Sequence, residues 1–239
     1  MASRAGQVIP AGRPGVMARR LPWGAAILAA LLAVLTLGTA AILALSDGAL
    51  WPRAADLAAL RFTLLQAALS AGLSCLLAVP LARALARRRF AGRGILITLL
   101  GAPFLLPVIV AVLGLLSVFG RSGLVNQALA ALGLPPLSIY GLQGVVLAHV
   151  FLNLPLATRM LLQGWQAIPA ERFRLAQSLG LSPAAQFRHL EWPMLRAVLP
   201  GAAVVIFAIC LASFAVALTL GGGPGATTVE LAIYQALRF

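Results

Sequence analysis

The chain has 239 residues, of which 62% are apolar and only 10% charged, and its mean hydropathy is +1.00. This composition excludes an ordinary soluble domain and predicts an all-α fold, that of a polytopic helical membrane protein. All 18 basic residues are arginine, so no lysine is present for a nucleotide-binding P-loop. The net charge of +13 would suit a nucleic-acid-binding protein, but the arginines flank apolar segments, and membrane topology explains them better.

The N-terminal part of the chain predicts a cytoplasmic arm followed by two spans. Residues 1–20 are basic and rich in Gly and Pro. Residues 21–46 carry no charge and could form about 39 Å of helix, which exceeds a hydrocarbon core of about 30 Å. That run is too long for a typical signal peptide. Residues 47–61 are expected to be a short polar connection and residues 62–82 a second span.

The middle of the chain predicts a third span and an external loop. Five arginines within residues 83–93 form the densest positive cluster, which is expected to anchor the topology. Residues 94–120 form the expected third span, and its two prolines predict a kink that faces the interior of a helix bundle. Residues 122–140 read as an external loop with a short interfacial helix over 124–132.

Two further spans are expected, over residues 142–162 and 197–220. His149 is the one strongly ionisable side chain deep within the predicted spans, whereas secondary carriers ordinarily keep several such groups there. Energy for any transport should therefore come from outside the membrane. His149 is equally consistent with a satisfied histidine between helices, and Asn153, one turn later, with a hydrogen bond across helices. Cys75 and Cys210 are isolated in apolar runs, which is typical of core packing.

Residues 163–196 form a polar interruption between the last two spans. Pro169 is suited to open a short helix, which is expected to end at Gly180 because glycine best tolerates the left-handed turn at a helix end. Two faces of this helix are expected, one formed by Phe173, Ala176 and Leu179 and the other by Glu171, Arg174 and Ser178.

A second short helix is predicted directly after Gly180. Ser182 is a good N-cap and Pro183 suits the first helical position. This helix should run toward Leu190 and break at Trp192-Pro193. Two short amphipathic helices joined by a glycine elbow would form a rigid knob between the spans.

The spacing within this knob resembles the cytoplasmic loop of permeases from bacterial binding-protein-dependent ABC importers. That loop reads E-A-A, three residues, G, nine residues, I-x-L-P. Ala176, Gly180, Leu190 and Pro193 match it in register, whereas Arg174 replaces the glutamate. Leu175 likewise stands where the family has its first alanine, so Glu171, one turn earlier, is the remaining acidic candidate. The resemblance implies an ATPase-coupling loop formed by Glu171, Arg174, Ala176, Ser178, Leu179, Gly180, Ser182, Pro183, Leu190 and Pro193.

Longer segments resemble the N-terminal half of thiamine importer permeases, in which two permease halves are fused. They cover residues 82–93, 118–123, 140–163 and 213–237. The resemblance implies the type I, molybdate- and maltose-type transmembrane domain in the inner membrane. It also implies a cytoplasmic pair of ATPase subunits, a periplasmic thiamine-binding protein and a second permease half. The cargo would be thiamine, with its phosphate esters as further candidates, and a permease for ferric iron or another small solute is the alternative.

The same resemblance suggests where cargo passes. No catalytic residue, metal ion or cofactor is expected. Candidate pathway residues are His149, Asn153, Ser213 and Phe214. Gly221, Gly222, Gly223 and Pro224 are candidates for a flexible outer gate or a turn that docks the binding protein, and a plain inter-helix loop is the alternative.

The distribution of arginine predicts the orientation. With the N-terminus in the cytoplasm, 14 of the 18 arginines lie in cytoplasmic segments, which places the knob there as well. Five spans would leave the C-terminus outside, where Thr227 and Glu230 have capping-box spacing for a helix reaching Leu237. Because such permease halves usually return through another span, we expect the sequence to stop before a sixth span and before a second coupling loop.

Two functions of other classes remain open at this point. An intramembrane serine protease could use Ser122, within Gly120-Arg121-Ser122-Gly123, with His149 as its base. Ser122 lies in a predicted loop beside Arg121, however, and no oxyanion donors are evident. A secondary carrier that works without an ATPase is the other alternative.

Overall fold

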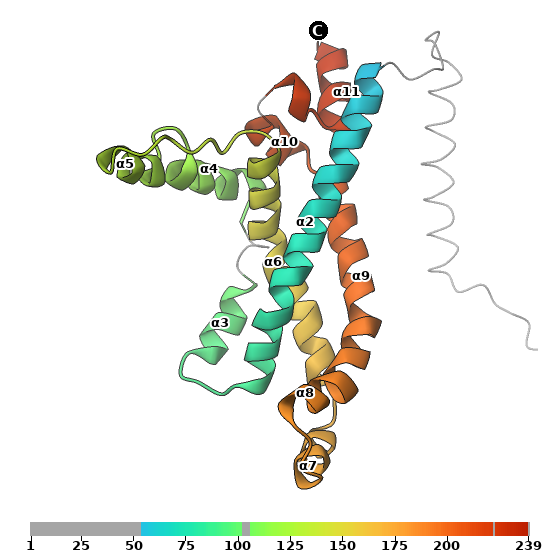
Figure 1. Ribbon diagram of the computed structural model, residues 1–239. Coiled ribbons are helices and arrows are strands. Elements are labelled where there is room, and N and C mark those ends of the chain that lie inside the picture. Colours follow the sequence, from blue (N-terminus) through green and yellow to red (C-terminus); the bar gives the residue numbers. More distant parts are fainter. Residues whose placement is uncertain (1–53, 102–105, 222, 239) are drawn as a thin grey trace, which may run out of the picture. The chain divides into compact units, whose positions relative to one another are not determined.

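The computed structural model describes residues 54–101, 106–221 and 223–238. The expected arm and the expected span over 21–46 lie outside these residues. The described part of the chain is built of α-helices, one π-helical turn and one 3-10 turn, without any strand (Figure 1). An all-α fold is therefore confirmed for the described residues.

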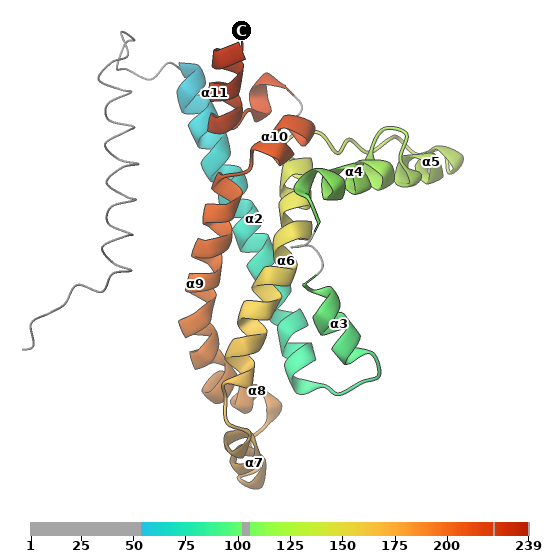
Figure 2. The ribbon, with the colours of Figure 1, turned by 180° about the vertical axis from the view of Figure 1, so that it is seen from behind.

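Three long helices pack against one another and form the core of the described part. They are α2 (Ala54–Arg87), α6 (Leu142–Gln166) and α9 (Trp192–Leu211), and Figures 1 and 2 show them side by side from opposite directions. Each contains an internal proline, which removes one backbone hydrogen bond. Neighbouring helices can compensate for that loss in a bundle, as they do in membrane proteins.

The face that α2 presents to the bundle consists mostly of small residues, while its opposite face is rich in leucine. Ala67, Ala78 and Ala82 are fully buried. Leu69, by contrast, is 40% exposed and Leu76 is 67% exposed. In water such a pattern would be unfavourable, but in lipid small residues allow helix backbones to approach closely and leucines lie against acyl chains. The packing thus supports a membrane environment independently of the composition.

Four helical segments among the described residues are long and apolar enough to cross a membrane: Ala54–Arg87, Val108–Ala131, Leu142–Gln166 and Pro183–Leu211. The expected span over 62–82 lies inside the first of these, which begins earlier and ends later. It therefore includes part of the predicted polar connection and two arginines of the positive cluster. The expected span over 142–162 is found as α6, extended by four residues.

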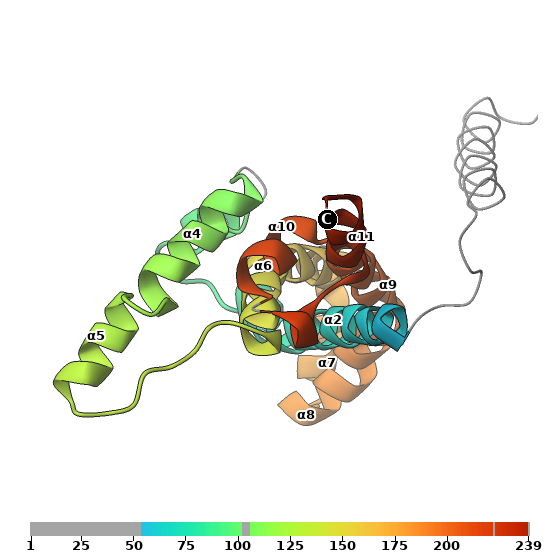
Figure 3. The same cartoon turned by 90° about the horizontal axis from the view of Figure 1, so that it is seen from above.

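The expected third span is wrong as a single helix. The chain forms α3 (Arg93–Leu99) and then begins again at α4 (Val108–Phe119). Pro107, the N-cap of α4, has an extended ψ of 134°, so the helix starts anew there. The 12 residues of α4 give only about 18 Å of helix. The short helix expected over 124–132 is confirmed as α5 (Leu124–Ala131), and Figure 3 shows α4 and α5 extending away from the three-helix bundle.

The expected fifth span is also divided. α9 ends at Leu211 and α10 (Phe214–Leu220) follows after a break at Ala212 and Ser213. Figure 1 shows α10 and α11 (Val229–Arg238) at one end of the bundle, and α7 (Ala170–Ser178) and α8 (Pro183–Gln186) at the other. This break and the opposite end of the bundle hold the two candidate sites.

Candidate functional site

The predicted knob is present as two short helices, α7 (Ala170–Ser178) and α8 (Pro183–Gln186). Gly180 has a positive φ of 66°, and the N–H of Leu181 donates to the carbonyl of Ala176 over 2.9 Å. This is the expected left-handed helix end. Ser182 caps α8, because its hydroxyl accepts the N–H of Ala185 at 3.3 Å. The glycine elbow and the second cap are both confirmed.

The predicted faces of α7 are only partly found. Ala176 is buried, but Leu179, expected on the same face, is 68% exposed. Glu171 and Arg174 form an exposed ion pair at 3.6 Å, as their shared face allows. Ion pairs at such exposure are worth little, so this one does not fix the knob. Leu179 and the exposed Leu175 instead give the tip of the knob an apolar surface.

The break expected at Trp192-Pro193 is wrong. After α8 the chain forms a π-helical turn, η2 (Phe187–Glu191), and passes directly into α9. Pro193 lies in the first turn of α9, where a missing N–H is tolerated. A π turn carries an extra residue, so the helix can absorb the proline without ending. The knob is therefore joined to α9 by continuous helix.

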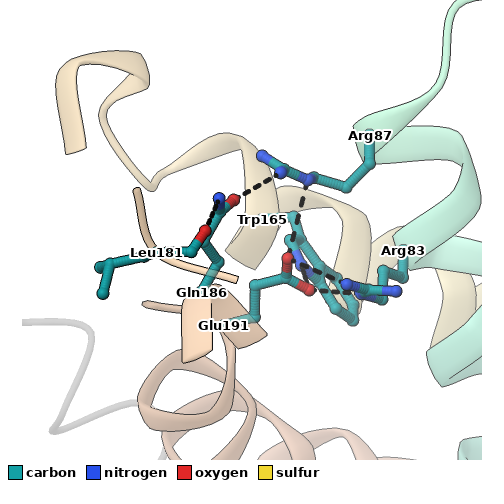
Figure 4. Close-up of polar contacts among 6 residues, drawn as sticks. All are labelled: Arg83, Arg87, Trp165, Leu181, Gln186 and Glu191. Atoms are coloured by element: carbon teal, nitrogen blue, oxygen red, sulfur yellow. Dashed lines mark hydrogen bonds and ion pairs between the residues drawn. The ribbon is translucent and has the colours of Figure 1, made fainter. Parts of the chain in front are cut away.

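A buried carboxylate lies at this junction. The side chain of Glu191 is 0% exposed, and Arg83 from α2 donates to it through Nε over 2.6 Å (Figure 4). Nε of Arg87 lies 3.6 Å from its other oxygen. The indole N–H of Trp165, from α6, donates to it over 3.3 Å. Glu191 therefore links α2, α6 and the start of α9.

Arg87 extends the same cluster into the knob. Its guanidinium donates to the amide oxygen of Gln186 over 3.2 Å and lies 4.0 Å from the ring centroid of Phe173. The amide nitrogen of Gln186 in turn donates to the carbonyl of Leu181 over 3.0 Å. We call Arg83, Arg87, Trp165, Gln186 and Glu191 the carboxylate cluster.

Glu191 was not among the residues predicted for the coupling loop, and it occupies the unspecified position of the loop motif. A signal was available, because Glu191 is one of only five acidic residues in the chain and adjoins an apolar run. Arg83 and Arg87 are also four residues apart, so they share one face of a helix. The prediction that these two arginines anchor the membrane topology was therefore incomplete, because they also pair with Glu191. Their contacts bring the two arginine-rich segments to the same end of the bundle.

The second candidate site is a cavity of about 410 Å³ at the break between α9 and α10. All four predicted pathway residues line it: His149 and Asn153 come from α6, Ser213 from the break and Phe214 from α10. None of the described residues that line it is Asp, Glu, Lys or Arg. Folding thus brings these four side chains together, while their role in transport stays a prediction.

Polar contacts across helices hold the wall of this cavity. The imidazole of His149 lies 3.4 Å from the hydroxyl of Ser70 through Nδ1, and its Nε2 contacts the hydroxyl of Ser213. Asn153 donates to Sγ of Cys210 at 3.4 Å. Gln66 donates to the carbonyl of Cys210 at 2.9 Å. We call Gln66, Ser70, His149, Asn153, Cys210 and Ser213 the uncharged cluster.

The glycine run near the cavity is a packed turn. A Cβ on Gly221 would lie 2.4 Å from the carbonyl oxygen of Ala217, so close backbone packing requires glycine there. Gly223 has a φ of 128°, and Pro224–Ala226 form a 3-10 turn, η3. Gly223 and Gly225, by contrast, have open space at their Cβ positions, and a role of this run as an outer gate stays a prediction. Gly222 lies outside the described residues, and docking of a binding protein stays a prediction.

The helix predicted to follow is present as α11, but its cap is Thr228. The hydroxyl of Thr228 accepts the N–H of Leu231 at 3.4 Å, as an N-cap does. The predicted capping box with Thr227 is therefore wrong by one residue. The physical reason is the 3-10 turn, which delays the start of the helix.

The protease alternative gains no support from this geometry. Both ring nitrogens of His149 contact hydroxyls of other serines, Ser70 and Ser213. Ser122 lies in the turn between α4 and α5, where its carbonyl accepts from the amide of Gln127 at 2.9 Å. A hydrogen bond between Ser122 and His149 is not found among the described residues.

Comparison with known proteins now identifies the family. No protein-family model matches the chain. It is 32% identical over 178 residues to the molybdenum transport system permease protein ModB of Azotobacter vinelandii, covering 74% of this chain and 78% of ModB. The chain belongs to the permease family of ABC importers. Its fold is therefore the expected type I transmembrane domain, and the chain is a multi-pass inner-membrane protein.

Two other relatives in this permease family are more similar but much longer. The thiamine transport system permease protein ThiP of Escherichia coli strain K12 is 54% identical over 180 residues, 75% of this chain and 34% of ThiP. ThiP of Brucella abortus strain 2308 is 49% identical over 181 residues, 75% of this chain and 33% of ThiP. This permease chain thus spans about a third of the length of these relatives.

Proposed function

We propose that this chain is part of the permease of an ATP-driven, binding-protein-dependent importer that carries thiamine, with its phosphate esters as further candidates, into the cytoplasm. Its partners are a cytoplasmic pair of ATPase subunits, a periplasmic thiamine-binding protein and a second permease half. The protein works as a transport subunit and leaves ATP hydrolysis to its partner. The observation that carries the proposal is the identity of about one half to two thiamine transport permeases.

The knob is the docking element for the ATPase in this proposal. It is a rigid unit, because Gly180 and Ser182 fix the turn between α7 and α8. Its tip exposes Leu175 and Leu179, which are suited to an apolar socket on a partner. The arginine count places this end of the bundle, and the N-terminus, in the cytoplasm, where an ATPase would be.

The cavity is the cargo path in this proposal. Thiamine is a cation with aromatic rings, and the described lining has no fixed positive side chain that would repel it. The ring of Phe214 lines the cavity and packs edge-on against Tyr234, with 5.2 Å between centroids. A cation over such a ring gains about 0.5 to 2 kcal/mol.

The proposal is tested by thiamine uptake. Labelled thiamine at nanomolar concentration is offered to a strain that cannot synthesise it, with and without the permease. ATP-dependent uptake only in the presence of the permease is the expected result. Equal thiamine uptake in both strains, together with loss of ferric-iron uptake in the strain without it, would move the cargo to iron. Uptake that persists without the ATPase would favour a secondary carrier.

The path itself is tested by a matched pair of substitutions. Phe214→Leu removes the ring that lines the cavity, whereas Phe151→Leu removes a ring that is 45% exposed on α6 and does not line it. With saturating loaded binding protein, we expect Phe214→Leu to slow thiamine uptake by about 2- to 30-fold, which is the cation–π energy converted to a rate ratio. Equal effects of the two substitutions would exclude this ring from the path.

A further inference from the structure

We propose that Glu191 is the positioning residue that transmits movement of the knob to α2 and α6. This inference rests on the proposed function, since it assumes that an ATPase moves the knob. It assigns a role to a residue outside the predicted coupling set.

Glu191 is the meeting point of three helices that are distant in sequence. Arg83 and Arg87 from α2 and Trp165 from α6 contact its two carboxylate oxygens (Figure 4). It belongs to η2, which runs without interruption from α8 into α9. A displacement of the knob therefore reaches this carboxylate through helix rather than through a flexible loop.

Burial makes these contacts difficult to release. The Glu191 side chain is fully buried, and a charge in such a place is stable only while its partners remain. Arg83 and Arg87 are 41% and 31% exposed, so water could solvate them if they separated, but the carboxylate has no such alternative. When Glu191 moves, α2 is therefore expected to follow it.

Arg87 gives the link a second connection to the knob. It contacts Phe173 on α7 and Gln186 on α8 as well as Glu191. Arg87 thus connects both knob helices, α7 and α8, to the carboxylate of Glu191. Arg188 lies exposed in η2, three residues before Glu191, and is not part of the carboxylate cluster, so it provides a control.

The test is Glu191→Gln, which keeps the size of the side chain and an oxygen for Trp165 but removes the charge. The permease is assembled with its ATPase in vesicles, loaded binding protein is supplied, and thiamine transported per ATP hydrolysed is measured. We expect this ratio to fall about fivefold or more, the lower end of typical coupling between sites. A purely structural role would lower the amount of complex and leave the ratio unchanged.

Arg188→Gln is the matched control, because it neutralises an exposed charge in the same π-helical turn, and its ratio should remain that of the wild type. If Glu191→Gln does not assemble, Arg87→Lys replaces it, since lysine keeps the charge but cannot make the same set of contacts. A wild-type ratio in the assembled variant would overturn the inference. Absence of ATP-dependent thiamine uptake by the wild type would instead overturn the proposed function.

Discussion

The two polar clusters of this bundle share α2 and α6 but use different chemistry. Ser70 and Arg83 are 13 residues apart on α2, which corresponds to about 20 Å of helix. Around Ser70 the uncharged cluster uses hydroxyls, amides and an imidazole. Around Arg83 the carboxylate cluster uses full charges. Position along one helix thus separates a hydrogen-bonded site from an ionic one.

The difference follows from access to water. Arg83 and Arg87 are long enough to keep part of their side chains exposed while their guanidinium groups reach Glu191. Charges near the bilayer centre are costly, whereas uncharged groups can be satisfied by one another there. An ionic contact is strong and suits a rigid mechanical link, while weaker contacts suit a cavity wall that must rearrange as cargo passes.

The largest effect is expected from removing both arginines of the carboxylate cluster. Arg83→Gln with Arg87→Gln leaves Glu191 buried without a cationic partner, which should destabilise the protein by about 3 to 5 kcal/mol. Unfolding in detergent measures the change. Arg88→Gln with Arg89→Gln removes the same charge from exposed positions and is the control. A similar loss of unfolding free energy in both double variants would show that the contacts of the carboxylate cluster do not stabilise the protein.

The next largest effect is expected at the start of α6, from backbone packing rather than charge. A Cβ on Gly144 in α6 would lie 1.5 Å from the carbonyl oxygen of Ile139, so Gly144→Ala must displace the chain. We expect a loss of about 1 to 3 kcal/mol in unfolding free energy. Gly114 in α4 has no atom within 4 Å of its Cβ position, and Gly114→Ala should be neutral or stabilising. If Gly144→Ala and Gly114→Ala changed the unfolding free energy equally, close backbone packing at Gly144 would not contribute to stability.

Much of this architecture could be predicted from local signals. Gly180 and Ser182 act through their own backbone and cap geometry, so sequence spacing was sufficient for the knob. The four pathway residues could also be named from the sequence. His149 and Asn153 are one turn apart on α6, and the family resemblance supplied Ser213 and Phe214. These predictions needed no knowledge of how the helices pack.

The errors concern two prolines and one buried charge. Pro193 was expected to end a helix, but a π turn over Phe187–Glu191 absorbs it. Pro107 was expected to kink one span and instead begins a new helix. Apart from being one of five acidic residues, Glu191 has no periodic or motif signal of its own, and its partners lie 26 to 108 residues away along the chain. Such contacts depend on tertiary packing, which spacing alone does not specify.

A smaller effect is expected at the elbow that precedes the carboxylate cluster. Gly180 has a φ of 66° and open space around its Cβ position, so a substitution there is opposed by backbone strain alone. Gly180→Val should cost about 1 to 2 kcal/mol and reduce stimulation of the ATPase by loaded binding protein. Asparagine tolerates this conformation better, so Gly180→Asn should retain most stimulation. Equal stimulation in wild type and the valine variant would show that elbow geometry does not matter for coupling.

The smallest effect should come from the uncharged cluster, where Ser213→Ala removes the hydroxyl that contacts Nε2 of His149. Hydrogen bonds between membrane helices contribute about 0.6 kcal/mol on average, because the unfolded chain in the bilayer also finds partners. Ser117→Ala is the control, since among the described residues that hydroxyl bonds to the carbonyl of Gly114 within its own helix. Unfolding free energies in detergent should therefore differ only slightly between the two variants. A loss for Ser213→Ala as large as that of the double arginine variant would abolish the distinction between the two clusters, since the uncharged wall would then be as rigid as the ionic link.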